Sequence, residues 1–82
     1  MPKYFFDINN GDGLTRDEDG AEFAFLDEVR DAAIRVLPDI ARDVLPDSGR
    51  RVLSVRVRDE DDRYVFHASL SLISEWLDVS ER

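Results

Sequence analysis

The chain of 82 residues is long enough for one domain, and it lies near the lower limit at which a core holds a fold without disulfides or metal ions. It contains no cysteine, which excludes disulfide scaffolds, thiolate chemistry and cysteine-ligated zinc. Nineteen acidic and eleven basic residues give a net charge of −8, which disfavours binding to a nucleic-acid backbone.

The apolar runs are only a few residues long, so none is expected to span a membrane. The first residues lead directly into a strand-like run without the apolar core of a signal peptide. We therefore expect a cytoplasmic protein.

The N-terminal part of the chain reads as two strands. Lys3–Asn9 alternates, with Tyr4, Phe6 and Ile8 on one face and Lys3, Phe5 and Asp7 on the other. Asn9–Gly13 has the composition of a tight turn, after which Leu14–Arg16 can pair back as a short strand. Asp17–Gly20 is then a charged turn, and Ala21–Ala24 is expected to lead into a helix.

Phe25–Leu45 is predicted to be an amphipathic helix. Its apolar residues recur at three- and four-residue steps and share one stripe: Leu26, Val29, Ala33, Val36, Leu37, Ile40 and Val44. Pro38 falls on the polar side, where we expect it to kink the helix and not to split it. The segment Pro46–Gly49 is predicted to end the helix.

Two further strands follow. Arg51–Arg58 alternates with Leu53, Val55 and Val57 on the buried face, and Asp59–Asp62 is predicted to be a hairpin loop. Arg63–Leu72 returns, with the following side chains predicted to point inward: Tyr64, Phe66, Ala68, Leu70 and Leu72. Residues 73–77 either extend this strand or form a last turn, and residues 78–82 are expected to be a frayed tail.

This order of elements predicts an α+β fold of type ββαββ, with a single domain over residues 1–77. The simplest arrangement is a four-stranded antiparallel sheet in the order 2-1-3-4, with the amphipathic helix covering one face.

Three segments resemble a known family: Pro2–Phe6 (a Pro-x-Tyr-Phe-Phe opening), Arg16–Gly20 (an Arg-Asp-x-x-Gly turn) and Ala41–Pro46 (an Ala-Arg-Asp-x-Leu-Pro helix end). In this order and spacing they resemble a family of small proteins from soil-type alphaproteobacteria, known only as a domain of unknown function. The similarity runs from about residue 2 to residue 72. It implies a ββαββ fold and supplies no activity.

The turn after the first strand could be read as a calcium loop running from Asp7 to Glu18. With Asp7 as the first ligand, Gly11 offers no side-chain oxygen at the fifth position and Asp12 replaces the glycine required at the sixth. A shifted frame makes Ile8 the first ligand. A hairpin turn is therefore the favoured interpretation, and no metal is assigned.

Two other candidates have simpler structural interpretations. The four carboxylates of Asp59–Asp62 could attract a divalent cation, but they repel one another on a solvated loop. His67 is the only histidine, and its neighbours Ser69 and Ser71 are ordinary strand residues, so no catalytic residue is assigned. We expect no cofactor and no small-molecule substrate.

The sheet face away from the helix is the most informative surface. We expect Phe5, Arg56, Arg58 and His67 on it, and an aromatic residue with arginines is a composition that interfaces favour. Trp76 should pack against its own sheet edge or against a second chain, with its own chain preferred.

The sequence thus predicts a non-catalytic interaction or accessory module that self-associates, as a homodimer, or binds a protein partner. The alternative is a nucleic-acid-binding regulator of the small antitoxin kind, which could use the same aromatic and arginine surface.

Overall fold

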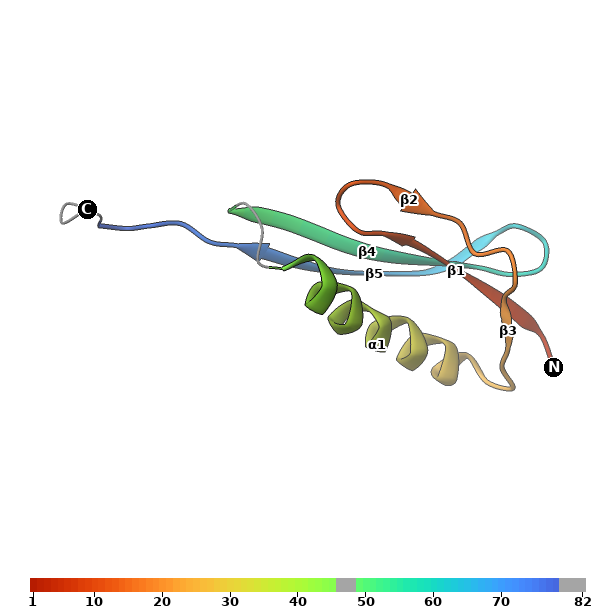
Figure 1. The fold of residues 1–82 in the computed structure, drawn as a ribbon. Helices are drawn as coiled ribbons and strands as arrows, with labels where there is room; N and C mark the ends of the chain where they lie inside the picture. The colour runs from red at the N-terminus through yellow and green to blue at the C-terminus, as the bar shows by residue number, and fades with distance from the viewer. Residues whose placement is uncertain (46–48, 79–82) are drawn as a thin grey trace.

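The computed structural model describes residues 1–45 and 49–78. One helix lies across one face of an open antiparallel sheet (Figure 1). The elements are β1 (Lys3–Asn9), β2 (Leu14–Thr15), β3 (Ala21–Glu22), α1 (Leu26–Val44), β4 (Arg50–Arg58) and β5 (Tyr64–Ile73). The strand order is β2-β1-β4-β5, so the predicted α+β class and the predicted sheet order are confirmed.

The outer edge of β1 carries one more strand than predicted. β2 pairs with its C-terminal end through Ile8 and Asn9, while β3 pairs with its N-terminal end through Lys3 and Tyr4. The residues of β3 were expected only to lead into the helix, and that expectation was wrong. The edge of the sheet is thus covered by two short strands with residues 16–20 between them.

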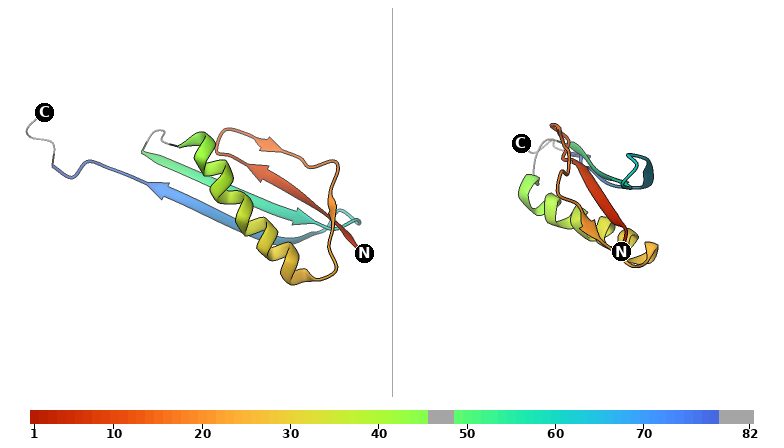
Figure 2. Two further views of the ribbon diagram at one scale, coloured as in Figure 1. Left: turned by 60° about the horizontal axis from the view of Figure 1, so that its bottom comes forward. Right: turned by 90° about the vertical axis from the view of Figure 1, so that its right-hand side faces the viewer.

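The core lies between α1 and the central strand β4. Its buried side chains alternate along β4 and recur at four-residue steps along α1: Leu53, Val55, Val57, Val29, Ala33 and Leu37. Apolar residues of β1 and β5 pack around this cluster. Figure 2 shows the helix crossing the sheet diagonally, so that it does not cover the C-terminal half of β5.

The helix is continuous across Pro38, which is exposed on the polar side as predicted. It is thus not split there, and its bounds lie one residue inside the predicted ones at each end. The N-cap residue Phe25 has no polar side chain, but its N–H donates to the Glu28 carboxylate over 3.2 Å. The predicted helix stop at Pro46–Gly49 falls largely on residues 46–48, outside the described residues.

A β-bulge changes the direction of one predicted core residue. Val57 pairs with Phe66 but Arg58 pairs with Tyr64, so β5 holds one extra residue, Val65, at this point. The extra residue turns Tyr64 to the face away from the helix, so the prediction that it points inward was wrong.

Leu70 and Leu72 lie on the helix side, as predicted, but they are 42% and 40% exposed. The reason is the diagonal path of α1, which leaves this corner of the sheet uncovered (Figure 2). Beyond β5, Trp76 is 79% exposed and is not buried against its own sheet edge. Of the tail predicted to fray, residues 79–82 lie outside the described residues.

Candidate interaction surface

A buried ion pair occupies the sheet face away from the helix. Asp7 and Arg58 are only 2% and 4% exposed, and two hydrogen bonds of 2.9 and 3.1 Å join the guanidinium to the carboxylate. The Tyr64 hydroxyl, brought to this face by the bulge, donates to the same carboxylate over 3.1 Å. Burial raises the pKa of Asp7, but the bonds from Arg58, the Asp17 N–H and Tyr64 outweigh it, so the pKa lies below its ordinary value.

Asp17 binds both members of this ion pair and covers them. Its N–H donates to Asp7 over 3.0 Å and its carbonyl accepts a hydrogen bond from Arg58. Its carboxylate accepts the N–H groups of Phe6, Asp19 and Gly20 over 3.0 to 3.1 Å. Burial raises the pKa of Asp17, and these backbone donors lower it below its ordinary value. The Arg-Asp-x-x-Gly motif therefore has a structural explanation, because its aspartate completes the edge of β1.

Phe5 belongs to the same layer. The Arg58 guanidinium lies 4.8 Å from the centre of its ring. On another side the ring approaches Gly20 so closely that a Cβ there would lie 2.8 Å from it. Phe5 is therefore half-buried between the two, and Arg58 is buried although we expected it to be exposed.

Arg56 and His67 remain accessible on this face. They are opposite one another across β4 and β5, and both are exposed. The Arg56 guanidinium lies 5.7 Å from the centre of the Tyr64 ring. With Phe66 these residues line a shallow hollow of about 390 Å³. Of the four predicted surface residues, two thus form an open strip while Phe5 and Arg58 support the fold beside it.

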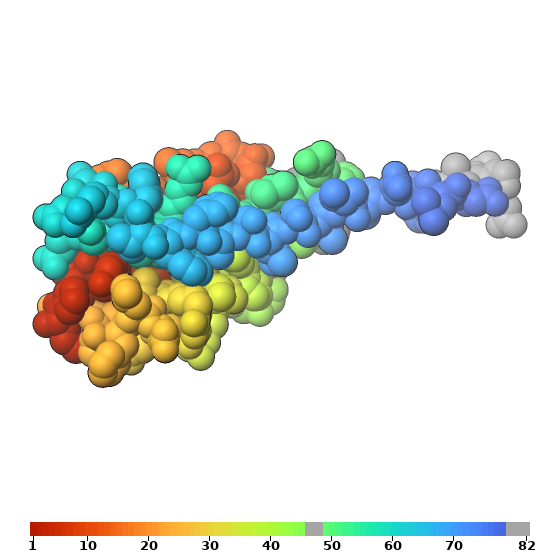
Figure 3. Space-filling model, turned by 180° about the vertical axis from the view of Figure 1, so that it is seen from behind, coloured from red at the N-terminus to blue at the C-terminus, as the bar shows by residue number. Residues whose placement is uncertain are grey.

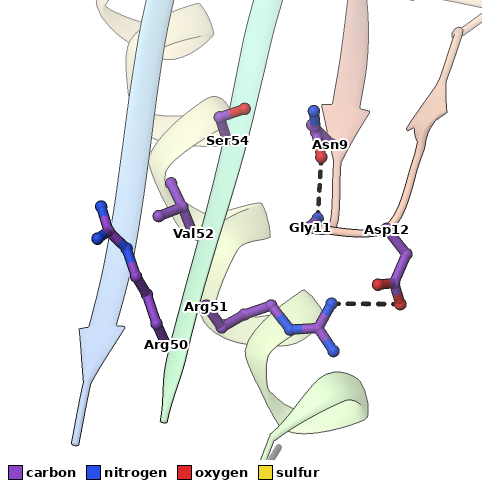
Figure 4. Close-up of a pocket in the computed structure, with 7 residues that line it drawn as sticks. All are labelled: Asn9, Gly11, Asp12, Arg50, Arg51, Val52 and Ser54. Atoms are coloured by element: carbon purple, nitrogen blue, oxygen red, sulfur yellow. Dashed lines mark hydrogen bonds and ion pairs between the residues drawn. The ribbon is translucent and has the colours of Figure 1, made fainter. Parts of the chain in front are cut away.

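A larger cleft of about 490 Å³ lies where the β1–β2 turn meets the start of β4 (Figure 4). Arg51 forms one wall, where it pairs with Asp12 over 3.2 Å and donates to the Asn10 carbonyl over 2.9 Å. Gly11 has φ +96° and lies against the Arg51 side chain, which holds the turn onto β4. The arginine here has a structural role in the turn.

The candidate calcium loop is a hairpin turn. Asp7 points to Arg58, and the Asn9 and Asn10 side chains accept N–H groups of the turn itself over 2.9 to 3.2 Å. In the acidic loop, Asp59 accepts the N–H groups of Asp61 and Arg63. Within residues 1–45 and 49–78, no three acidic, histidine or cysteine side chains group as metal ligands would.

The outer edge of β5 is the surface that sequence reasoning did not single out. The strand has ten residues without Asp, Glu, Lys or Arg, in a chain of which 37% is charged. In Figure 3 it forms a ridge facing the viewer, with the first half of α1 beneath it and the C-terminal segment running away from the body. The absence of charge over these ten residues is the sequence signal that could have identified it.

Below this edge lies an apolar pocket of about 240 Å³, lined by Leu26, Asp27, Val29, Arg30, Val65 and Phe66. Leu26, which was expected in the core stripe, is 65% exposed at its mouth. The two charged side chains of this rim pair with each other over 3.8 Å, and Arg30 also binds Asp31 over 3.1 Å. We name the outer side of β5 together with this pocket the β5 edge surface.

In the described part of the chain, no helix combines the length and apolar character that crossing a membrane requires. No curated protein and no solved structure matches the chain. One family model, described as Domain of unknown function (DUF6894), matches residues 3–71, which takes in every strand and the helix except the last two residues of β5. The expected resemblance to a family of unknown function is thereby confirmed, and the chain belongs to this family.

Proposed function

We propose that this chain is a non-catalytic interaction module that associates with itself through the β5 edge surface. The observation that supports this most directly is the ten-residue edge strand without a charged side chain, which includes the exposed Leu70 and Leu72. Long uncharged edge strands pair readily with other strands, and natural proteins normally protect them with charges, prolines or a covering element. Beyond the bulge at Val65, the rest of β5 carries no charge or proline, which is what a strand-pairing interface requires.

The open face offers less to a partner than the edge does. Its centre is occupied by Asp7, Arg58 and Asp17, whose polar groups already bind one another. Arg56 and His67 form only a narrow strip beside them. Within residues 1–45 and 49–78, no side chain hydrogen-bonds to His67, which leaves it without the positioned partner that acid–base catalysis uses.

The test is the mass in solution, measured by light scattering over a tenfold range of concentration. We expect twice the chain mass of 9.4 kDa. Leu70→Lys should lower the mass toward one chain, whereas Arg56→Ser on the open face should leave it at two. A monomer at every concentration contradicts self-association, and a dimer lost only with Arg56→Ser moves the interface to the open face.

Nucleic-acid binding is the second candidate, and one observation favours it. The Arg56 guanidinium over the Tyr64 ring, next to His67, is the kind of stacking surface on which single-stranded bases bind. A salt-dependent shift of single-stranded RNA that Arg56→Ser abolishes would support it. The net charge of −8 opposes it, so we expect no shift at physiological salt.

A further inference from the structure

We infer that the partner on the β5 edge surface is a second copy of this chain, paired antiparallel with Ser69 opposite Ser69 of the partner subunit. The inference rests on the proposed function and adds the strand register and the place where the C-terminal segment binds.

Charge is the first argument for a second copy. Two chains that each carry −8 repel when their acidic surfaces meet, and pairing along β5 brings together the longest uncharged stretch of backbone. The charges at the pocket rim do not oppose contact, because Arg30 already pairs with Asp27 and Asp31. An apolar side chain can therefore cover the pocket without separating an ion pair.

Symmetry fixes which residues can face each other. Two antiparallel copies of one strand are related by a twofold axis perpendicular to the sheet, which keeps both helices on the same side. Residues directly opposite then share a face, so the axis passes through one residue position. Centred on Ser69, the register places Leu72 opposite Phe66 and Leu70 opposite Ala68 of the partner subunit, and each uncovered leucine gains an apolar neighbour.

Neighbouring registers match less well. Centred on Ala68, the register places Leu72 opposite Tyr64 of the partner subunit, whose ring the bulge has turned to the other face. Centred on Leu70, it places Phe66 opposite Ser74, which lies beyond the end of β5. Ser69 is the centre that keeps Phe66, Leu70 and Leu72 each opposite another apolar residue on the helix side.

The pocket and the C-terminal segment then complement each other. In this register, Leu72 of one copy lies beside Phe66 of the partner subunit, which lines the apolar pocket. The segment beyond β5, with Trp76 79% and Leu77 89% exposed, then passes the start of the partner's β5, beside which Leu26 is 65% exposed at the pocket mouth. A single contact can thus cover the exposed side chains of the C-terminal segment and of the pocket mouth. The twofold axis repeats this contact, so the dimer contains it twice.

The opposite edge of the sheet explains why assembly stops at two. β2, β3 and the Asp17 carboxylate already bind the outer edge of β1, so in the described part of the chain this side of the sheet ends in two-residue strands, which offer a further copy little backbone to pair with. A β5–β5 pair is therefore closed.

Single cysteines test the register, since the natural chain has none. In Ser69→Cys the two Cα atoms lie about 4.5 to 5.5 Å apart, within the span of a disulfide. In the matched control Ser71→Cys, exposed on the same face of the same strand, they lie about 14 Å apart along the strands. Under mild oxidation we expect Ser69→Cys to form covalent dimers at least about tenfold faster than Ser71→Cys, because the strand spacing keeps the two cysteines of Ser71→Cys too far apart to link.

Fluorescence of the single tryptophan tests where the segment binds. We expect Trp76 emission to shift to shorter wavelength as concentration rises through the dimerisation range, and Leu26→Lys to remove the shift. An unshifted emission in a dimeric sample overturns the tail contact.

The outcomes separate the two levels of inference. A monomer by light scattering overturns both the proposed function and this geometry. A dimer in which Ser71→Cys links as fast as Ser69→Cys, or in which neither links, overturns the geometry and leaves self-association standing. A mass that grows beyond two chains overturns the closed pair.

Discussion

Along β1, the outer edge of the sheet is bonded at both ends, by β2 at Ile8 and Asn9 and by β3 at Lys3 and Tyr4. Between them the Asp17 carboxylate accepts the N–H of Phe6, as a neighbouring strand would. Along β5, ten residues without a charged side chain have a partner strand on one side only. One edge is completed inside the chain, and the other is open.

The two edges also differ in the side chains that they carry, which are hydrogen-bonded polar groups at β1 and exposed apolar groups at β5. The β1 side holds a buried ion pair, to which Asp17 and Tyr64 add three further hydrogen bonds. The β5 side has exposed leucines over an uncovered corner of the sheet. A buried network specifies one arrangement of its own chain, whereas exposed apolar surface gains free energy only when something covers it.

The largest expected effect comes from breaking the buried ion pair. Arg58→Met leaves the Asp7 carboxylate buried without its main partner, which should cost about 3 to 5 kcal/mol in the free energy of unfolding. Urea denaturation measures it. Arg56→Met, on the same face of the same strand but exposed, is the control and should cost less than about 1 kcal/mol. Equal losses of unfolding free energy in the two variants would show that the buried ion pair stabilises the fold no more than an exposed arginine does.

Acid should lower the stability of the fold by protonating the carboxylates at the β1 edge. The pKa values of Asp7 and Asp17 lie below the ordinary 3.8 in the folded protein, so the unfolded chain takes up protons first as the pH falls. Their stabilisation is complete above about pH 5 and is lost as the pH falls through the folded-state pKa values. Urea midpoints measured from pH 7 to pH 3 should drop, and Asp7→Asn should make that drop shallower. An unchanged slope in Asp7→Asn would contradict this.

Close packing at the end of the same loop gives the next effect. Gly20 has φ +69°, and a Cβ there would meet the Phe5 ring at 2.8 Å and the Lys3 side chain at 2.9 Å. Gly20→Ala should therefore cost about 1 to 2 kcal/mol from the backbone conformation alone. Gly13→Ala, with open space around its Cβ, should stay within about 0.5 kcal/mol of the natural chain. Thermal unfolding of the two variants compares them directly, and a neutral Gly20→Ala would rule out this packing.

The sequence predicted the helix, the long strands and the sheet order because their periodicities reflect burial against one core. It did not predict β3 or the direction of Tyr64. A two-residue strand has too few positions to show alternation, and a bulge shifts the alternation without any residue type that marks it. Leu70 was placed on the correct face, but its exposure depends on the diagonal path of α1, which a strand pattern does not contain.

The same limit applies to the candidate surface. Phe5, Arg56, Arg58 and His67 were grouped correctly on one face by alternation alone. That Arg58 is buried while Arg56 is free to meet solvent depends on Asp17, more than forty positions away in the sequence, which covers only the former. Long-range contacts of this kind are visible only once the chain is folded.

The smallest expected effect on the stability of the fold comes from a substitution that tests the β5 edge surface. Leu72→Lys adds one charge to β5 at a side chain that is 40% exposed in the single chain, so the fold should lose no more than about 0.5 kcal/mol. In the dimer that charge would lie beside Phe66 of the partner subunit, and the dissociation constant should rise by about tenfold, or about 1.4 kcal/mol. Light scattering across the dissociation range measures the change.

Val52→Lys is the matched control for that variant, because Val52 is 42% exposed but lies on the inner strand β4 and on the opposite face. It adds the same charge to the chain and should leave the dissociation constant unchanged. If both lysines weaken the dimer equally, net charge governs association and not the edge. If neither does, the exposed leucines of β5 lie outside the contact, and the proposed register is wrong.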